Sequence, residues 1–142
     1  MPTLALVLHI KKAHIMANWI LSDHTLRITV TAEATEGNAI ITAVRQAIDD
    51  PAFGPGLNLL IDIRHYSSPA AMQIAPDELR NRAAGISRLG FRHCALVVAP
   101  APLERGLAQR FAGYAEEHGL PTSVFEEVEE AERWLAHSRI SR

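Results

Sequence analysis

Four polar or charged residues follow the apolar run LLIDI (residues 59–63): Arg64, His65, Ser67 and Ser68. Guanidinium, imidazole and hydroxyl groups are the side chains that anion binding, acid–base catalysis and phosphorylation use. A serine hydrolase needs a turn such as G-x-S-x-G, and the sequence has none. The alternative is that SSP is an ordinary turn whose hydroxyls cap backbone groups. The stretch is therefore a candidate site without a defined chemistry.

Another cation, Arg105, follows the next apolar run, CALVVAP (residues 94–100). Both runs are predicted strands, and ligands of open α/β sheets bind beyond the carboxyl ends of the strands. We therefore predict that Arg64 and Arg105 lie near the same edge of the sheet, where they would form an anion pocket.

Metal and cofactor sites have no signature in this sequence. The seven histidines and the single cysteine, Cys94, form no H-x-H, H-x-x-x-H or C-x-x-C pair. The phosphate-binding strings G-x-G-x-x-G and G-x-x-x-x-G-K are absent. The sequence predicts neither a metal nor a cofactor. Because Cys94 stands in the apolar string RHCALVVA, we expect a buried thiol that behaves as a small hydrophobe.

Length and charge limit the class of protein. The chain has 142 residues, which suits one domain with its own core. Its net charge of −2 provides no basic surface for nucleic acid. The apolar string TLALVLHI (residues 3–10) is too short to span a bilayer and lacks the positive flank of a signal peptide. We expect a cytoplasmic protein in which residues 1–13 form an apolar arm or edge strand and residues 14–142 form one domain. A homodimer through this arm is an alternative to its packing on its own sheet.

Hydrophobic periodicity predicts the secondary structure. TLRITVT (residues 25–31) alternates like a half-buried strand, and the turn SDHT predicts a hairpin with the apolar stretch before it. GLNLLIDI (residues 56–63) and CALVVAP are nearly continuous apolar runs, which are typical of strands buried on both faces. TSVFE (residues 122–126) is a further short strand.

Four predicted helices alternate with these strands. Their apolar stripes are Ile40, Val44 and Ile48; Leu79, Ala83 and Ile86, in a helix that begins near Pro76; Leu103, Leu107, Phe111 and Ala115; and Val128, Ala131 and Leu135. The alternation predicts a single α/β domain with a mixed, mostly parallel sheet and an N-terminal hairpin at one side.

Several strings resemble the STAS fold family (sulfate transporters and anti-sigma-factor antagonists), in its SpoIIAA-like branch. They are DDPAFGPGLNLLIDIR, CALVVAP followed by RGLAQRFAGYAEEHG, and VFEEVEEAERWL, and the resemblance covers about residues 15 to 136. It implies a non-enzymatic bacterial module that acts through a protein partner or a small ligand. Because the branch is similar in outline to lipid-binding CRAL-TRIO domains, the alternative is a carrier of a small apolar, lipid-like ligand. A hydrolase that uses Ser67 or Ser68 with His65 is a third reading.

The resemblance also implies a role for the two serines. In the switch members of the family, a serine just after this strand, within a D-S-[ST]-G string, is phosphorylated by a partner kinase. The corresponding stretch here, HYSSPAAMQIAPDEL, contains Ser67 and Ser68 but lacks the aspartate and the glycine. Ser67 and Ser68 are thus phosphorylation candidates, and Arg64, His65 and Arg105 join them as candidate contacts for a ligand or partner.

Overall fold

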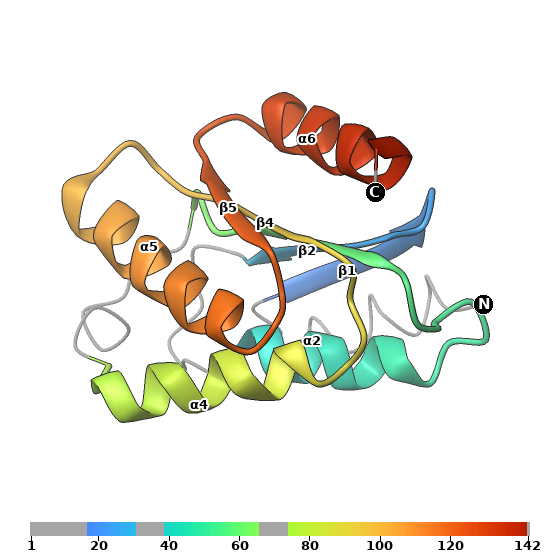
Figure 1. Ribbon diagram of the computed structural model, residues 1–142, viewed down its shortest axis with the longest axis horizontal. Coiled ribbons are helices and arrows are strands. Elements are labelled where there is room, and N and C mark those ends of the chain that lie inside the picture. Colours follow the sequence, from blue (N-terminus) through green and yellow to red (C-terminus); the bar gives the residue numbers. More distant parts are fainter. Residues whose placement is uncertain (1–16, 31–38, 66–73, 142) are drawn as a thin grey trace.

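The computed structural model describes residues 17–30, 39–65 and 74–141 (Figure 1). In chain order its elements are β1 (Ala17–Ser22), β2 (Thr25–Val30), α2 (Ala39–Ile48), β3 (Asn58–Asp62), α4 (Pro76–Ser87), β4 (Cys94–Val97), α5 (Pro102–Glu117), β5 (Thr122–Phe125) and α6 (Val128–Ser141). The predicted arm at residues 1–13 and the candidates Ser67 and Ser68 lie outside the described residues. No described helix has the length and apolar character that crossing a bilayer requires.

The strands form one five-stranded sheet in the order β1-β2-β3-β4-β5. β1 pairs with β2 in the antiparallel sense, and the three remaining pairs are parallel. Asp23 and His24 form the hairpin turn with φ angles of 54° and 59°, a left-handed conformation that Asp and His adopt more readily than most residues. The predicted mixed sheet, with its hairpin at one side and β3 in the centre, is confirmed.

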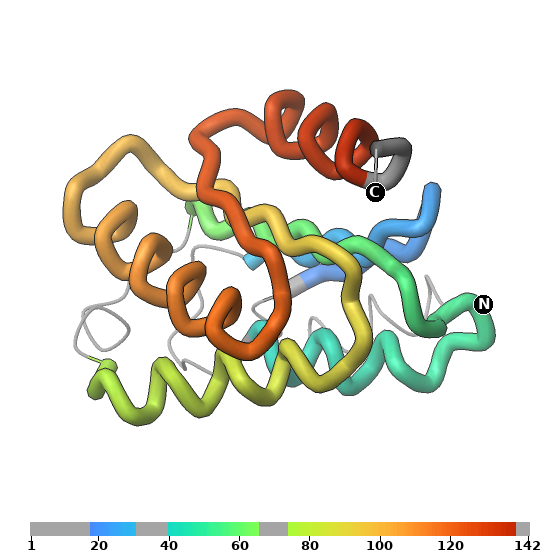
Figure 2. The backbone as a smooth tube through the Cα atoms, viewed as in Figure 1, coloured from blue at the N-terminus to red at the C-terminus, as the bar shows by residue number. Residues whose placement is uncertain are grey.

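Helices cover the two faces of the sheet unequally (Figures 1 and 2). The parallel strands are added in chain order without a reversal. The three helices that connect them, α2, α4 and α5, therefore lie on one face. α6 follows the last strand and packs on the opposite face, over β3, β4 and β5. One face thus has three helices, and the other has α6 alone among the described helices.

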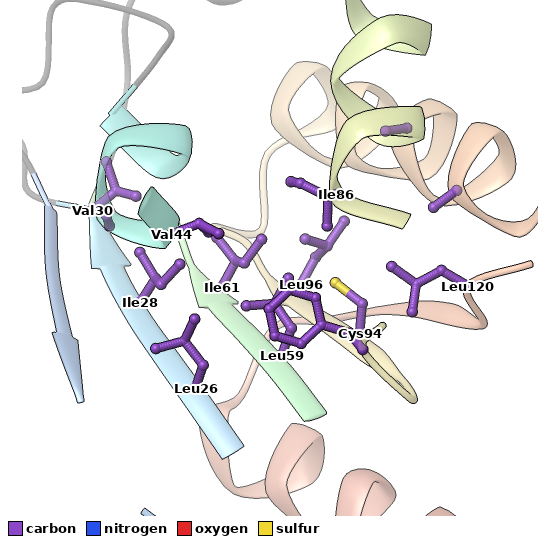
Figure 3. Packing of buried hydrophobic residues seen from close by; sticks show 14 of the residues in the cluster. Leu26, Ile28, Val30, Val44, Leu59, Ile61, Ile86, Cys94, Leu96 and Leu120 are labelled. Atoms are coloured by element: carbon purple, nitrogen blue, oxygen red, sulfur yellow. The ribbon is translucent and has the colours of Figure 1, made fainter. Parts of the chain in front are cut away.

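The main core lies between the sheet and the helices α2, α4 and α5 (Figure 3). Alternate residues of β2, β3 and β4 point into it, as a period of two requires: Leu26, Ile28, Val30, Leu59, Ile61, Cys94 and Leu96. The intervening residues of the central strands, including Leu60 and Val97, meet Val128, Ala131 and Leu135 of α6. β3 is therefore buried on both faces, which explains its continuous apolar sequence.

The apolar stripe predicted for α5 is partly wrong. Leu103 is 73% exposed, whereas Ala108, Ala112 and Ala115 are the buried residues of the helix. Residues spaced by four turn through 400°, so a stripe with this spacing drifts by about 40° per step around the helix. Ala115 faces the core, and Leu103, three such steps earlier, has rotated into solvent. Ile48, at the end of the stripe predicted for α2, is 40% exposed.

Cys94 confirms the expected buried thiol. It has no exposed surface and lies in the main core, beside Leu59 of β3. Burial raises its pKa to about 12. A thiol with this pKa remains protonated near neutral pH, and the side chain acts as a packing group rather than as a nucleophile.

Candidate functional site

An apolar pocket of about 110 Å³ lies on the three-helix face of the sheet, toward the carboxyl ends of β3 and β4. The described residues that line it come from α2, β3, α4, β4, the first half of α5 and the adjoining segments: Ile40, Ile41, Ile61, Ile63, Ile74, Leu79, Arg82, Ile86, Leu96, Glu104, Leu107, Ala108 and Phe111. Ligands of α/β proteins bind near the carboxyl ends of the parallel strands, which is where this pocket lies.

The local sequence explains why space remains there. Ile61 and Ile63 are two residues apart on one strand and so point to the same face. From α5, the small side chain of Ala108 faces the pocket between the larger Leu107 and Phe111. Among the lining residues that the structure describes, only Arg82 and Glu104 are charged, and Arg82 forms an ion pair with Glu78 of its own helix. The pocket is therefore suited to an apolar group.

The charged candidate Arg64 lies on the other face of the sheet. Its side chain makes two hydrogen bonds to Asp62: Nε donates to Oδ1 at 3.0 Å and Nη2 donates to Oδ2 at 2.9 Å. The backbone N–H of Arg64 also donates to Oδ1, at 3.1 Å. The Asp62 side chain is only 2% exposed, so this fork neutralises a buried carboxylate at the end of the central strand.

Electrostatics at the pair favour both charged forms. Burial tends to raise the pKa of Asp62, but the hydrogen bonds and charge of Arg64 outweigh it and hold that pKa below its ordinary value. The hydrogen bond to Asp62 raises the pKa of Arg64, with help from the nearby Glu127 and Glu129. The guanidinium is thus held between the strand end and the acidic start of α6.

Arg105 has a similar arrangement at the start of α5. Its Nη1 donates to Glu126 Oε2 at 2.9 Å, and both side chains are 43% exposed. Arg64 and Arg105 therefore both lie against the acidic segment at residues 126–129, but each already has a carboxylate partner. An anion bound there would compete with these carboxylates, and the predicted anion pocket stays a prediction.

The other predicted candidates have fewer described surroundings. His65 is exposed in the turn after β3, and Ser67 and Ser68 lie outside the described residues. Among the described residues, no group of three or more His, Cys, Asp and Glu side chains is arranged to hold a metal.

Two features of the site were missed from the sequence. Asp62 was not named as the partner of Arg64, although their spacing of two places them on one face of a strand. The pocket was also missed, although Ile63 and Ile74 border the predicted loop. Because side chains alternate at the end of β3, the pocket and the ion pair lie on opposite faces of the sheet. Ile61 and Ile63 face the pocket, and Asp62 and Arg64 lie on the face that α6 covers.

The comparison with solved structures identifies the fold. The chain is similar to an uncharacterized protein of the DUF3478 family from Shewanella loihica PV-4, which has a SpoIIAA-like fold. The TM-score is 0.53 at 16% sequence identity, over 84% of this chain and 91% of that one. The fold is SpoIIAA-like. This confirms the resemblance inferred from the sequence at the level of fold. No family model matches the sequence, and no curated protein does.

Within this SpoIIAA-like fold, His93 just before β4 is a candidate pH-sensitive residue. Burial, with a contribution from the charge of Arg92, lowers its pKa below the ordinary 6.5. The unfolded chain therefore binds a proton more readily there than the folded chain, and stability should fall as the pH drops through about 6.5. We expect His93→Phe to flatten the dependence of the free energy of unfolding on pH between 7 and 5, measured by urea titration. His137→Phe, at an exposed position of α6, is the control, and an equal flattening in both variants would contradict the assignment.

Proposed function

We propose that this protein is a non-enzymatic, STAS-like binding module whose ligand inserts an apolar group into the pocket between the sheet and α2, α4 and α5. The apolar pocket on the carboxyl side of β3 and β4 is the observation that carries this proposal. The described lining residues include neither a nucleophile nor a cluster of titratable groups, which favours binding over catalysis. The SpoIIAA-like fold supports the same reading, because this fold hosts regulatory modules in the proteins that the sequence resembles.

The size of the pocket limits the ligand. An apolar cavity of roughly 150 Å³ in a protein core holds benzene. A pocket of about 110 Å³ therefore accommodates one small ring or a short branched chain, not a long acyl chain. We propose a small molecule or a single apolar side chain of a partner as the occupant, in preference to a membrane lipid.

The pocket predicts a measurable response to small apolar molecules. Toluene should raise the melting temperature of the wild-type protein, because a ligand that binds only the folded state stabilises it. Ala108→Leu adds three carbon atoms within the lining and should abolish this rise. Differential scanning fluorimetry measures both effects, and native mass spectrometry of freshly purified protein shows whether a cellular ligand is retained.

A matched change on the other face of the sheet controls this test. Ala136→Leu makes the same substitution at an exposed position of α6, outside the pocket. It should leave the response to toluene unchanged. Equal stabilisation of the wild-type and Ala108→Leu proteins, or none in the wild type at saturating toluene, would overturn the pocket as the binding site.

We further propose that a protein partner contacts the charged edge at Arg64, His65 and Arg105, and that Ser67 and Ser68 are phosphorylation candidates. The fixed position of Arg64 beside the acidic start of α6 supports this part of the proposal. Phosphopeptide mapping of the protein from its native cells tests the serines. A bacterial, cytoplasmic homodimer remains a prediction, and light scattering of the purified chain tests its mass.

A further inference from the structure

A groove of about 840 Å³ lies on the face of the sheet that α6 covers. α6 packs over β3, β4 and β5, and the hairpin β1–β2 extends beyond it (Figure 1). The groove follows this boundary, and its lining residues are Ile20, Ser22, Asp23, His24, Thr25, Arg27, Asn58, Leu60, Glu132, Leu135 and Ala136. The whole sheet separates it from the apolar pocket described above.

Asn58 is the polar side chain at the base of this groove. It is only 2% exposed, and its Oδ1 has no hydrogen-bond partner. Its backbone N–H is satisfied by His24 O at 2.8 Å, so the unmet acceptor belongs to the side chain alone. Along β3, the side chains on this face are Asn58, Leu60 and Asp62. Asp62 has Arg64 as its partner, whereas the acceptor of Asn58 has none, and Asn58 is one of the residues that line the groove. Nearly all buried polar atoms in proteins have a hydrogen-bond partner, so this atom indicates a missing donor.

A second unmet atom lies beside Asn58. Leu59 pairs with Cys94, and the N–H of Leu59 donates to His93 O at 2.9 Å, which places His93 next to Asn58 across the two strands. The Nδ1 atom of His93 is buried without a partner, and the ring meets Trp134 of α6 edge-on, with 5.5 Å between the centroids. Asn58 and His93, two neighbouring residues beneath α6, thus each have a buried polar atom without a partner.

The lining of the groove combines apolar residues with polar and charged ones. Leu60 and Leu135 lie at its inner end, almost fully buried in the cluster beneath α6, and Ile20 is 61% exposed at its outer side. Across the rim, Arg27 Nη1 donates to Glu132 Oε2 at 3.0 Å, with 39% of the arginine side chain exposed. A guanidinium of this kind can stack on a planar ring. A mixed lining, a cation that can stack on a ring and one deep amide together fit a flat molecule with a polar edge.

We propose that this groove is a second small-molecule site, for a heteroaromatic ring or cyclic amide whose N–H group donates to Asn58 Oδ1. The carboxamide of Asn58 also has an amino group, so it matches a ring edge that presents a donor next to an acceptor. The ring lies beside Ala136 on the exposed side of α6, and the guanidinium of Arg27 stacks on its outer face. The site is independent of the apolar pocket and of the ligand proposed for it.

The test uses 2-pyridone and N-methyl-2-pyridone, which differ in the N–H donor. Titration of the full-length, ¹⁵N-labelled protein with 2-pyridone should shift amide resonances near Asn58, Leu60 and Ala136. The N-methyl compound should bind about tenfold more weakly, because it leaves the buried acceptor unmet. Ala136→Trp fills the groove from the exposed side of α6 and should weaken 2-pyridone binding at least tenfold. Asn58→Leu should do the same while retaining the fold, since it removes an unsatisfied polar group.

Ala108→Leu, in the other pocket, is the control and should leave 2-pyridone binding unchanged. Equal affinity for both compounds would overturn the proposed hydrogen bond. Shifts confined to residues around Ile61 and Phe111 would assign the ligand to the other pocket and overturn the site. No shifts at all would indicate that Asn58 is satisfied by water alone, and would also overturn it.

Discussion

Replacing Leu59 with alanine should lower the free energy of unfolding by about 3 kcal/mol, within the range of roughly 2–5 kcal/mol for buried leucines. Leu59 has no exposed surface, lies on the central strand and packs into the main core between the sheet and its three helices. The alanine leaves a cavity that its neighbours on β2 and β4 cannot fill, because the sheet fixes their positions. Urea titration followed by far-ultraviolet circular dichroism measures the loss.

Leu103→Ala is the matched control for this prediction. The chemical change is the same, but Leu103 is 73% exposed in the first turn of α5. We expect its free energy of unfolding to change by no more than about 0.5 kcal/mol, because surface substitutions remove few contacts and alanine favours a helix. A loss at Leu103 equal to that at Leu59 would show that the stripe predicted from the sequence is buried after all.

Replacing Arg64 with alanine should cost about 1–3 kcal/mol of stability. The change leaves the carboxylate of Asp62 buried, at 2% exposure, without its fork of two hydrogen bonds. Removing one partner of a fully buried ion pair costs roughly 3–5 kcal/mol. We expect less here because 36% of the Arg64 side chain is exposed and water can reach the vacated space. Thermal and urea unfolding at pH 7 measure the loss.

The pH dependence provides a second check on the same pair. Arg64 holds the pKa of Asp62 below its ordinary value despite the opposing effect of burial. Stability from Asp62 is therefore present above the unfolded pKa of 3.8 and is lost as the pH falls through the folded value. In Arg64→Ala this stabilising contribution should disappear, so the difference between variant and wild type should shrink as the pH is lowered toward 3.

Two variants separate the buried pair from a surface ion pair. Arg105→Ala removes a pair whose side chains are both 43% exposed, and it should cost about 0.5 kcal/mol or less. The double change Asp62→Asn with Arg64→Ala removes the buried charge as well and should recover part of the loss. Equal losses in Arg64→Ala and Arg105→Ala would contradict the argument that burial of Asp62 sets the size of the effect.

Much of the fold could be predicted because strand periodicity and turn chemistry are local. TLRITVT alternates on a half-buried strand, and the same alternation appears in β2, where Leu26, Ile28 and Val30 are buried. The double-sided burial of β3 is likewise visible as an unbroken apolar run. The buried faces of the helices were predicted less well. A stripe with a spacing of four winds around the helix, so the sequence does not tell which of its residues meet the sheet. Packing placed Ala108 and Ala115 inward and left Leu103 in solvent.

The candidate site could be predicted only in part. The sequence placed polar groups after β3, and the structure positions Arg64 there. Its partner, Asp62, shares a strand face with it. Their hydrogen bonds matter for stability only because α6 and the neighbouring strands bury Asp62, and that burial is not visible in the sequence. The apolar pocket was not predictable, since its lining residues come from five separate elements that meet only after folding.

The sequence by itself determined the class of the fold and the location of the central strand, because hydrophobic period and turn residues act over a few positions. In the stretch LLIDIR, the alternation of residues also predicts that Ile61 and Ile63 share one face of the strand and that Asp62 and Arg64 share the other. Only the tertiary structure decided what each face meets: helices α2, α4 and α5 enclose a pocket beside Ile61 and Ile63, and α6 brings acidic residues to Arg64. The unmet acceptor of Asn58 likewise depends on distant segments, because a side chain's burial and partners are properties of the packed chain.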